Sequence, residues 1–149
     1  MPLYNSPYSD PEKAKVIMAF ENWVKTPKLT AYRIALAEKQ KCPITGVPIT
    51  YQNANVHYKQ PLSLWAILKA FLDIKGLTLD SSLVQSRISG TRQRVLVPAQ
   101  SLQFEWATFH RKYAEYQVTS SNAKYPRRDD IADAVAAEIM KREKAQAPT

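Results

Sequence analysis

The side chains with the clearest capacity for chemistry lie in one short stretch, residues 54 to 61, which reads Ala-Asn-Val-His-Tyr-Lys-Gln-Pro. Its histidine, His57, is one of two in the chain. An imidazole that titrates near neutral pH can serve as a base or as a metal ligand. A Cys-Pro-Ile-Thr-Gly turn, Cys42 to Gly46, lies shortly upstream. Whether His57 works in an active site depends on the elements that hold these two segments.

Composition sets the broad class of the protein. The chain has 149 residues, 45% of them hydrophobic, which predicts one domain with one sizeable core. Its net charge of +8 favours a polyanionic partner such as nucleic acid. The single cysteine, Cys42, allows no internal disulfide and no cysteine-rich zinc site, which is typical of a reducing, cytoplasmic location. We expect no signal peptide and no membrane span.

Capping residues and apolar spacing predict helices at both ends of the chain. A Ser9-Asp10-Pro11-Glu12 start predicts a helix to about Lys25, which Pro27 should end. A second helix should run from Thr30 to about residue 41. A last helix should begin between 126 and 130 and carry an apolar stripe at Ile131, Val135 and Ile139.

The middle of the chain alternates extended and helical patterns. Prolines, Gly46 and β-branched residues predict a β-hairpin between 42 and 56. The most hydrophobic helix should follow Ser63 and close at Gly76. Residues 77 to 98 are typical of a basic loop, 99 to 113 of a helix, and 116 to 119 of a short strand. The predicted fold is α+β, a mostly helical single domain of residues 1–149 around a short antiparallel β-hairpin.

Four segments of this chain resemble HNH-type endonucleases of bacteria and phages. That family shows a Cys-Pro-x-Thr-Gly turn, a Val-Asp-His-Lys-x-Pro segment before a helix, a Trp-x-x-Phe/Tyr-His helix and a Ser-x-x-Asn segment. The corresponding stretches here are Cys42–Gly46, Val56–Pro61, Trp106–His110 and Ser120–Asn122. The resemblance covers residues 42–125, between a helical scaffold (1–41) and a C-terminal helix (126–145) with a frayed tail (146–149).

The resemblance implies a ββα-metal fold for DNA cleavage. In such a site a histidine activates water, an asparagine orients it, and a divalent cation such as Mg²⁺ stabilises charge on the phosphate. Carried onto this chain, His57 and Asn122 would be the catalytic residues. His57, Asp129 and Asp130 would be the metal ligands. Asn in a polar loop and Asp at a helix start are also ordinary turn and cap residues.

The sequence departs from the family at its central pair. Where the family has Asp-His, this chain has His57-Tyr58. A tyrosine, with a pKa near 10, is a poor base at neutral pH. Two interpretations stay open: His57 acts after a one-residue shift, which would turn side chains to the opposite strand face, or the site has decayed and only binding survives.

Other candidate sites have simpler structural explanations. Cys42 lacks a nearby histidine and is expected to be a small buried residue. His110 is expected to pack in or beside the core. Asp73 and Lys75 match half of a PD-(D/E)xK nuclease site, but they close a helix at Gly76, where a lysine suits the helix dipole.

Basic residues predict the nucleic-acid surface. If the strand and the hairpin pair, these residues should form one rim for phosphates. The alternative is a set of separate, solvated faces. The predicted contacts are Lys59, Arg87, Arg92, Arg94, Arg111, Lys112, Lys124, Arg127 and Arg128.

The sequence thus predicts a nucleic-acid-binding protein, for DNA rather than RNA, on an HNH-like scaffold. The alternatives are an active metal-dependent nicking or homing-type endonuclease, and an interaction domain that docks on a protein partner through its C-terminal helix.

Overall fold

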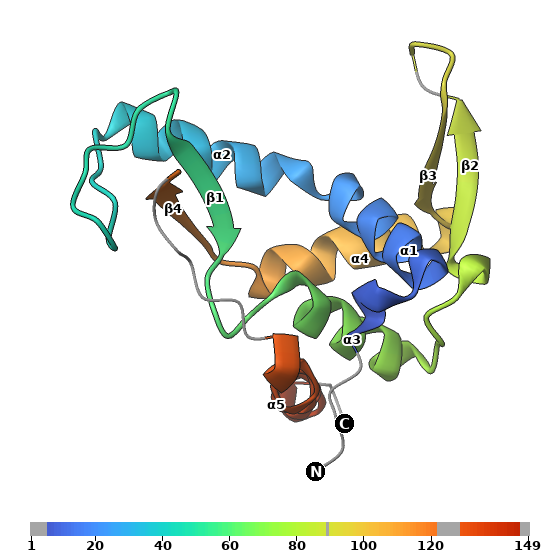
Figure 1. Cartoon of the computed structure of the whole chain (residues 1–149). Helices are drawn as coiled ribbons and strands as arrows, with labels where there is room; N and C mark the ends of the chain where they lie inside the picture. Colours follow the sequence, from blue (N-terminus) through green and yellow to red (C-terminus); the bar gives the residue numbers. More distant parts are fainter. Residues whose placement is uncertain (1–5, 89, 122–128, 147–149) are drawn as a thin grey trace.

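A computed structural model describes residues 6–88, 90–121 and 129–146, which form helices and two small antiparallel sheets (Figure 1). The α+β class is confirmed at this level. The helices are α1 (Pro11–Trp23), α2 (Lys25–Ala37), α3 (Leu64–Lys75), α4 (Gln100–Tyr113) and α5 (Ala132–Gln146). The strands are β1 (Ala54–Tyr58), β2 (Val84–Ile88), β3 (Arg94–Pro98) and β4 (Tyr116–Ser120). Short 3₁₀ turns occupy Pro7–Ser9, Ser81–Leu83 and Asp129–Ile131.

The first two helices follow one another almost directly. Asp10 caps α1, and its Oδ1 accepts a hydrogen bond from the backbone N–H of Glu12 at 3.0 Å. The predicted first helix is confirmed. The predicted break at Pro27 is wrong, because α2 begins at Lys25 rather than at Thr30. Pro27 lies in the first turn of α2, where backbone N–H groups have no acceptor within the helix, so the lack of an N–H costs no hydrogen bond.

Helix α3 lies at the centre of the main core, as its sequence predicts. The Ser63 hydroxyl accepts from the backbone N–H of Ala66 at its start, and Gly76 ends it in the left-handed conformation at φ 68°. Helices α1, α4 and α5 pack against it. Its buried residues are Leu64, Trp65, Ala66, Ile67, Leu68, Ala70, Phe71 and Leu72.

Helices α4 and α5 complete this core from two sides. Trp106 of α4 is fully buried, and its indole N–H donates to the backbone carbonyl of Phe20 at 2.9 Å. Helix α5 buries Ala132, Ala136 and Ile139 and makes its main contacts with α3. Much of the apolar stripe on the C-terminal helix is therefore used within the chain.

Strands β1 and β4 form the first sheet, with Val56 opposite Val118 and His57 opposite Gln117. The predicted strand at 116–119 is confirmed. The predicted hairpin between 42 and 56 is wrong: β1 pairs with the distant β4, and the preceding segment forms a turn with an isolated bridge between Lys41 and Pro48. Prolines in that segment lack the N–H groups that a strand ladder needs.

The second sheet is a hairpin of β2 and β3, in the segment whose sequence predicts a basic loop. Gln85 lies opposite Val97 and Ile88 opposite Arg94. The loop prediction is therefore wrong, because the run Val95-Leu96-Val97, which is rich in β-branched residues, forms a strand that pairs with β2. The hairpin packs at its base on α1 and projects from the helical body (Figure 1). In the described part of the chain, no helix is long and apolar enough to cross a membrane.

Candidate functional site

Tyr58, which the resemblance to HNH-type proteins would align with a catalytic histidine, contacts the buried face of α4. Its hydroxyl lies 2.8 Å from Nε2 of His110, and the hydroxyl of Tyr116 lies 3.2 Å from the same nitrogen. His110 is 0% exposed, so the prediction that it belongs to the core is confirmed. The two tyrosines face each other across β1 and β4, with ring centroids 5.0 Å apart. Together the three side chains join the first sheet to α4.

Burial sets the protonation states of this cluster. It raises the pKa of Tyr58 far above the ordinary value, and the nearby Tyr116 and Glu21 add to the rise. Burial lowers the pKa of His110 to about 4. A protonated His110 would need partners for both ring nitrogens, whereas its Nδ1 has none among the described residues. Tyr58 is thus fixed as a neutral phenol and cannot act as a base near neutral pH.

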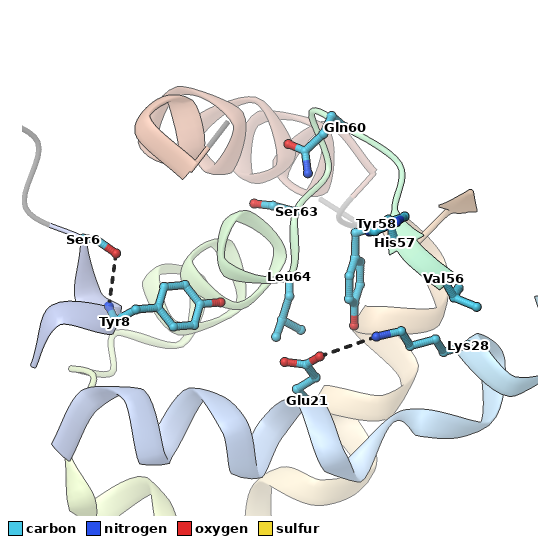
Figure 2. Close-up of a pocket in the computed structure, with 10 residues that line it drawn as sticks. All are labelled: Ser6, Tyr8, Glu21, Lys28, Val56, His57, Tyr58, Gln60, Ser63 and Leu64. Carbon is cyan, nitrogen blue, oxygen red and sulfur yellow. Dashed lines mark hydrogen bonds and ion pairs between the residues drawn. The ribbon is translucent and has the colours of Figure 1, made fainter. Parts of the chain in front are cut away.

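His57 lies on the opposite face of β1 from Tyr58, because successive strand residues alternate. Its Nε2 is 2.9 Å from the hydroxyl of Thr119 on β4, a side chain that is fully buried. Both His57 and Tyr58 border a cavity of about 620 Å³ (Figure 2). His57 is therefore held in place by its contact with β4, and it borders the cavity.

The segments that resemble HNH-type proteins meet around this sheet. The hydroxyls of Thr45 and Ser120 are 3.1 Å apart, which joins the Cys42–Gly46 turn to the end of β4. Cys42 is buried beneath that turn, as predicted, and its sulfur accepts from the backbone N–H of Thr45 at 3.4 Å. The Tyr58–His110 contact brings two more of the segments together. Asn122 lies outside the described residues.

The predicted metal ligands do not form a described site. Among residues 6–88, 90–121 and 129–146, no group of three His, Cys, Asp or Glu side chains is placed to hold a metal ion. His57 lies on β1 and Asp130 in the 3₁₀ turn before α5. The side chain of Asp129 lies outside the described part of the chain.

The basic residues of the hairpin are exposed and lie away from Lys59. Arg92 occupies the turn with φ 64°, and Arg94 begins β3. The guanidinium carbon of Arg87 lies 5.7 Å from the ring centroid of Trp23 on α1. Lys59 directly follows β1, whose sheet is separate from the β2–β3 hairpin (Figure 1). Among the described residues, the hairpin arginines and Lys59 thus do not share one sheet, although β4 does pair with β1.

The remaining predicted phosphate contacts differ in their surroundings. Arg111 is exposed on α4. The Nζ of Lys112 lies 2.7 Å from Oε1 of Glu143 on α5, so this lysine links two helices. The predicted contacts Lys124, Arg127 and Arg128 lie outside the described residues.

Sequence reasoning missed two features of the surface. One is the projecting hairpin, for which the run Val95-Leu96-Val97 was the available signal. The other is an ion pair between Glu21 on α1 and Lys28 on α2, with 3.8 Å between Oε1 and Nζ. No local sequence pattern predicts that ion pair, because it depends on the angle between two helices.

Comparison with known proteins gives no family model, no curated protein and no solved structure that matches this chain. The likeness to HNH-type proteins therefore stays a prediction. A functional conclusion has to rest on the geometry and charge of the sites themselves.

Proposed function

We propose that this protein binds double-stranded DNA through the β2–β3 hairpin. The observation that carries the proposal is a two-stranded ribbon that projects from the body, within a segment, 81 to 98, that has three arginines and no acidic residue. The major groove of B-DNA is wide enough for a two-stranded β-ribbon. The major groove of A-form RNA is deep and narrow, which favours DNA as the partner.

The two faces of the hairpin suit different tasks. Arg87 lies on the face that contains Val97 and contacts Trp23, so it holds this face of the ribbon against α1. The other face carries Arg94 opposite Ile88, which is 65% exposed. Arginine can bind phosphate or guanine, and an exposed aliphatic side chain can contact a thymine methyl group. This face is therefore the expected DNA-contacting side, with Arg92 at its tip.

The surroundings of His57 and Tyr58 support DNA binding without cleavage. Tyr58 is neutral, half-buried and hydrogen-bonded to His110. His57 makes a close contact with the buried Thr119. Both groups thus have structural roles between β1, β4 and α4.

Fluorescence anisotropy with a short labelled duplex tests the proposal. Affinity should fall steeply between about 50 and 200 mM salt, because each phosphate contact releases counterions. The double variant Arg92→Ala/Arg94→Ala should bind more weakly and lose about 2 from the slope of log K against log salt. A matched control, Arg33→Ala/Arg142→Ala, removes two exposed arginines of α2 and α5 and should keep the slope. Equal losses in both variants, or no binding at low salt, would overturn the proposal.

Cleavage is tested separately with supercoiled plasmid and Mg²⁺ or Mn²⁺. We expect no metal-dependent nicking by the full chain. Nicks that disappear with EDTA and in His57→Ala would instead make His57 part of a working nuclease site.

A further inference from the structure

A cavity of about 620 Å³ lies where the end of α1, the start of α2, β1 and the start of α3 meet (Figure 2). Its volume falls in the range of small-molecule sites, roughly 300–1,000 Å³. Tyr8 and Tyr58 stand on either side of it in Figure 2, and Leu64 lies between them. Val56 adds further apolar surface. These side chains suit the flat faces of a ring, since aromatic and aliphatic groups pack well against one.

Among the described residues that line the cavity, Glu21 supplies a carboxylate and Lys28 an ammonium, beside the uncharged polar groups of Ser6, Gln60 and Ser63. The 3.8 Å separation of the carboxylate and the ammonium is longer than a hydrogen bond, and these two side chains are 39% and 38% exposed. A smaller cavity of about 210 Å³ is bordered by the same two residues and Tyr58. The pair therefore retains hydrogen-bonding capacity toward a ligand: the carboxylate only accepts, and the ammonium only donates.

We propose that this cavity binds a guanine base. Guanine presents a carbonyl acceptor, O6, next to two donors, the N1–H and the 2-amino group. Lys28 would donate to O6, and Glu21 would accept from the two donors. Adenine has an amino donor in place of O6, and its N1 is an acceptor. It would therefore present a donor to Lys28 and an acceptor to Glu21, and neither could form a hydrogen bond. A free guanine nucleotide and an unpaired guanosine in a strand share this chemistry.

The inference stands apart from DNA binding by the hairpin. The hairpin packs on α1 through β3, whereas the cavity lies between α1 and β1. Neither of the exposed hairpin residues Arg92 and Arg94 borders it. The two proposals can therefore fail independently.

Isothermal titration of the full chain with guanosine, inosine and adenosine monophosphates is the test. Inosine lacks the 2-amino group, so guanosine monophosphate should bind about tenfold more tightly than inosine monophosphate. Its affinity should exceed that of adenosine monophosphate by at least the same factor. Glu21→Gln should lower guanosine monophosphate affinity about tenfold and remove the preference over inosine monophosphate. Glu12→Gln is the matched control, because Glu12 lies on the same helix with an exposed side chain.

Two further measurements identify the source of the base and guard against misfolding. A single strand with one guanine, compared with the same strand carrying inosine, shows whether an unpaired base is bound; selectivity for the mononucleotide alone indicates a free nucleotide. Glu21→Gln should keep the salt-dependent duplex binding of the unmodified chain, and Arg92→Ala/Arg94→Ala should keep nucleotide binding. Equal binding of the three mononucleotides, no binding of any, or unchanged affinity in Glu21→Gln would overturn the proposal.

Discussion

Acidification from about pH 7 to about pH 4 should destabilise this protein through His110. Burial lowers the pKa of this imidazole from 6.5 to about 4, so the folded chain keeps it neutral where the unfolded chain protonates it. Its contribution to stability is complete above pH 6.5 and is lost progressively as the pH falls to 4. At about 1.4 kcal/mol for each pH unit, the loss amounts to about 3 kcal/mol. That is a large part of the roughly 5–15 kcal/mol that stabilises a typical domain.

Urea unfolding at several pH values, followed by tryptophan fluorescence, measures this loss. Trp106 lies 5.4 Å from His110 between ring centroids and should report unfolding of this region. His110→Gln cannot be protonated in this range, and its amide can still bond the Tyr58 hydroxyl. Between about pH 7 and about pH 4, the free energy of unfolding of this variant should therefore decrease by about 3 kcal/mol less than that of the unmodified chain. Asp80 and Glu143 have pKa values lowered from 3.8 and 4.5 by their hydrogen-bond partners, so their contributions to stability are also lost in acid, but both are present in the two proteins and cancel in the comparison.

Identical pH dependence in the two proteins would refute this reasoning. Proton NMR provides a direct check, because the chain has two histidines and their ring signals can be assigned by substitution. A His110 signal that titrates near 6.5 would show that the imidazole is not buried as described.

Three substitutions test the local and packing arguments by urea unfolding. Ser63→Ala removes the hydroxyl that accepts from Ala66 and should cost about 1 kcal/mol; an unchanged midpoint would mean that this cap does not stabilise α3. Gly76→Ala should cost about 1–2 kcal/mol from backbone strain alone, because φ is 68° and no atom lies within 4 Å of the added Cβ, and a neutral result would argue against the left-handed cap. Trp106→Phe leaves the carbonyl of Phe20 without its donor and should cost at least about 1–3 kcal/mol, whereas a smaller loss would show that water replaces the indole.

Local sequence was enough to predict most helices and one strand. Asp10, Ser63 and Gly76 act on backbone groups within a few residues, so their effect can be seen without the fold. The apolar density of α3 predicted its central place. Pro27 shows the limit of such rules, because proline is compatible both with the end of one helix and with the first turn of the next.

The pairing of strands and the composition of both candidate sites were decided by tertiary structure. Strand β1 pairs with β4, and Tyr58 contacts His110, which is 52 residues away in the sequence. Both contacts form because the aromatic rings pack together in the fold, and no local turn specifies them. Glu21 and Lys28 come together only through the angle between α1 and α2. The sequence by itself determined the charge of the protein and the ends of many of its elements. Long-range packing decided which side chains share a cavity and which arginines project into solvent.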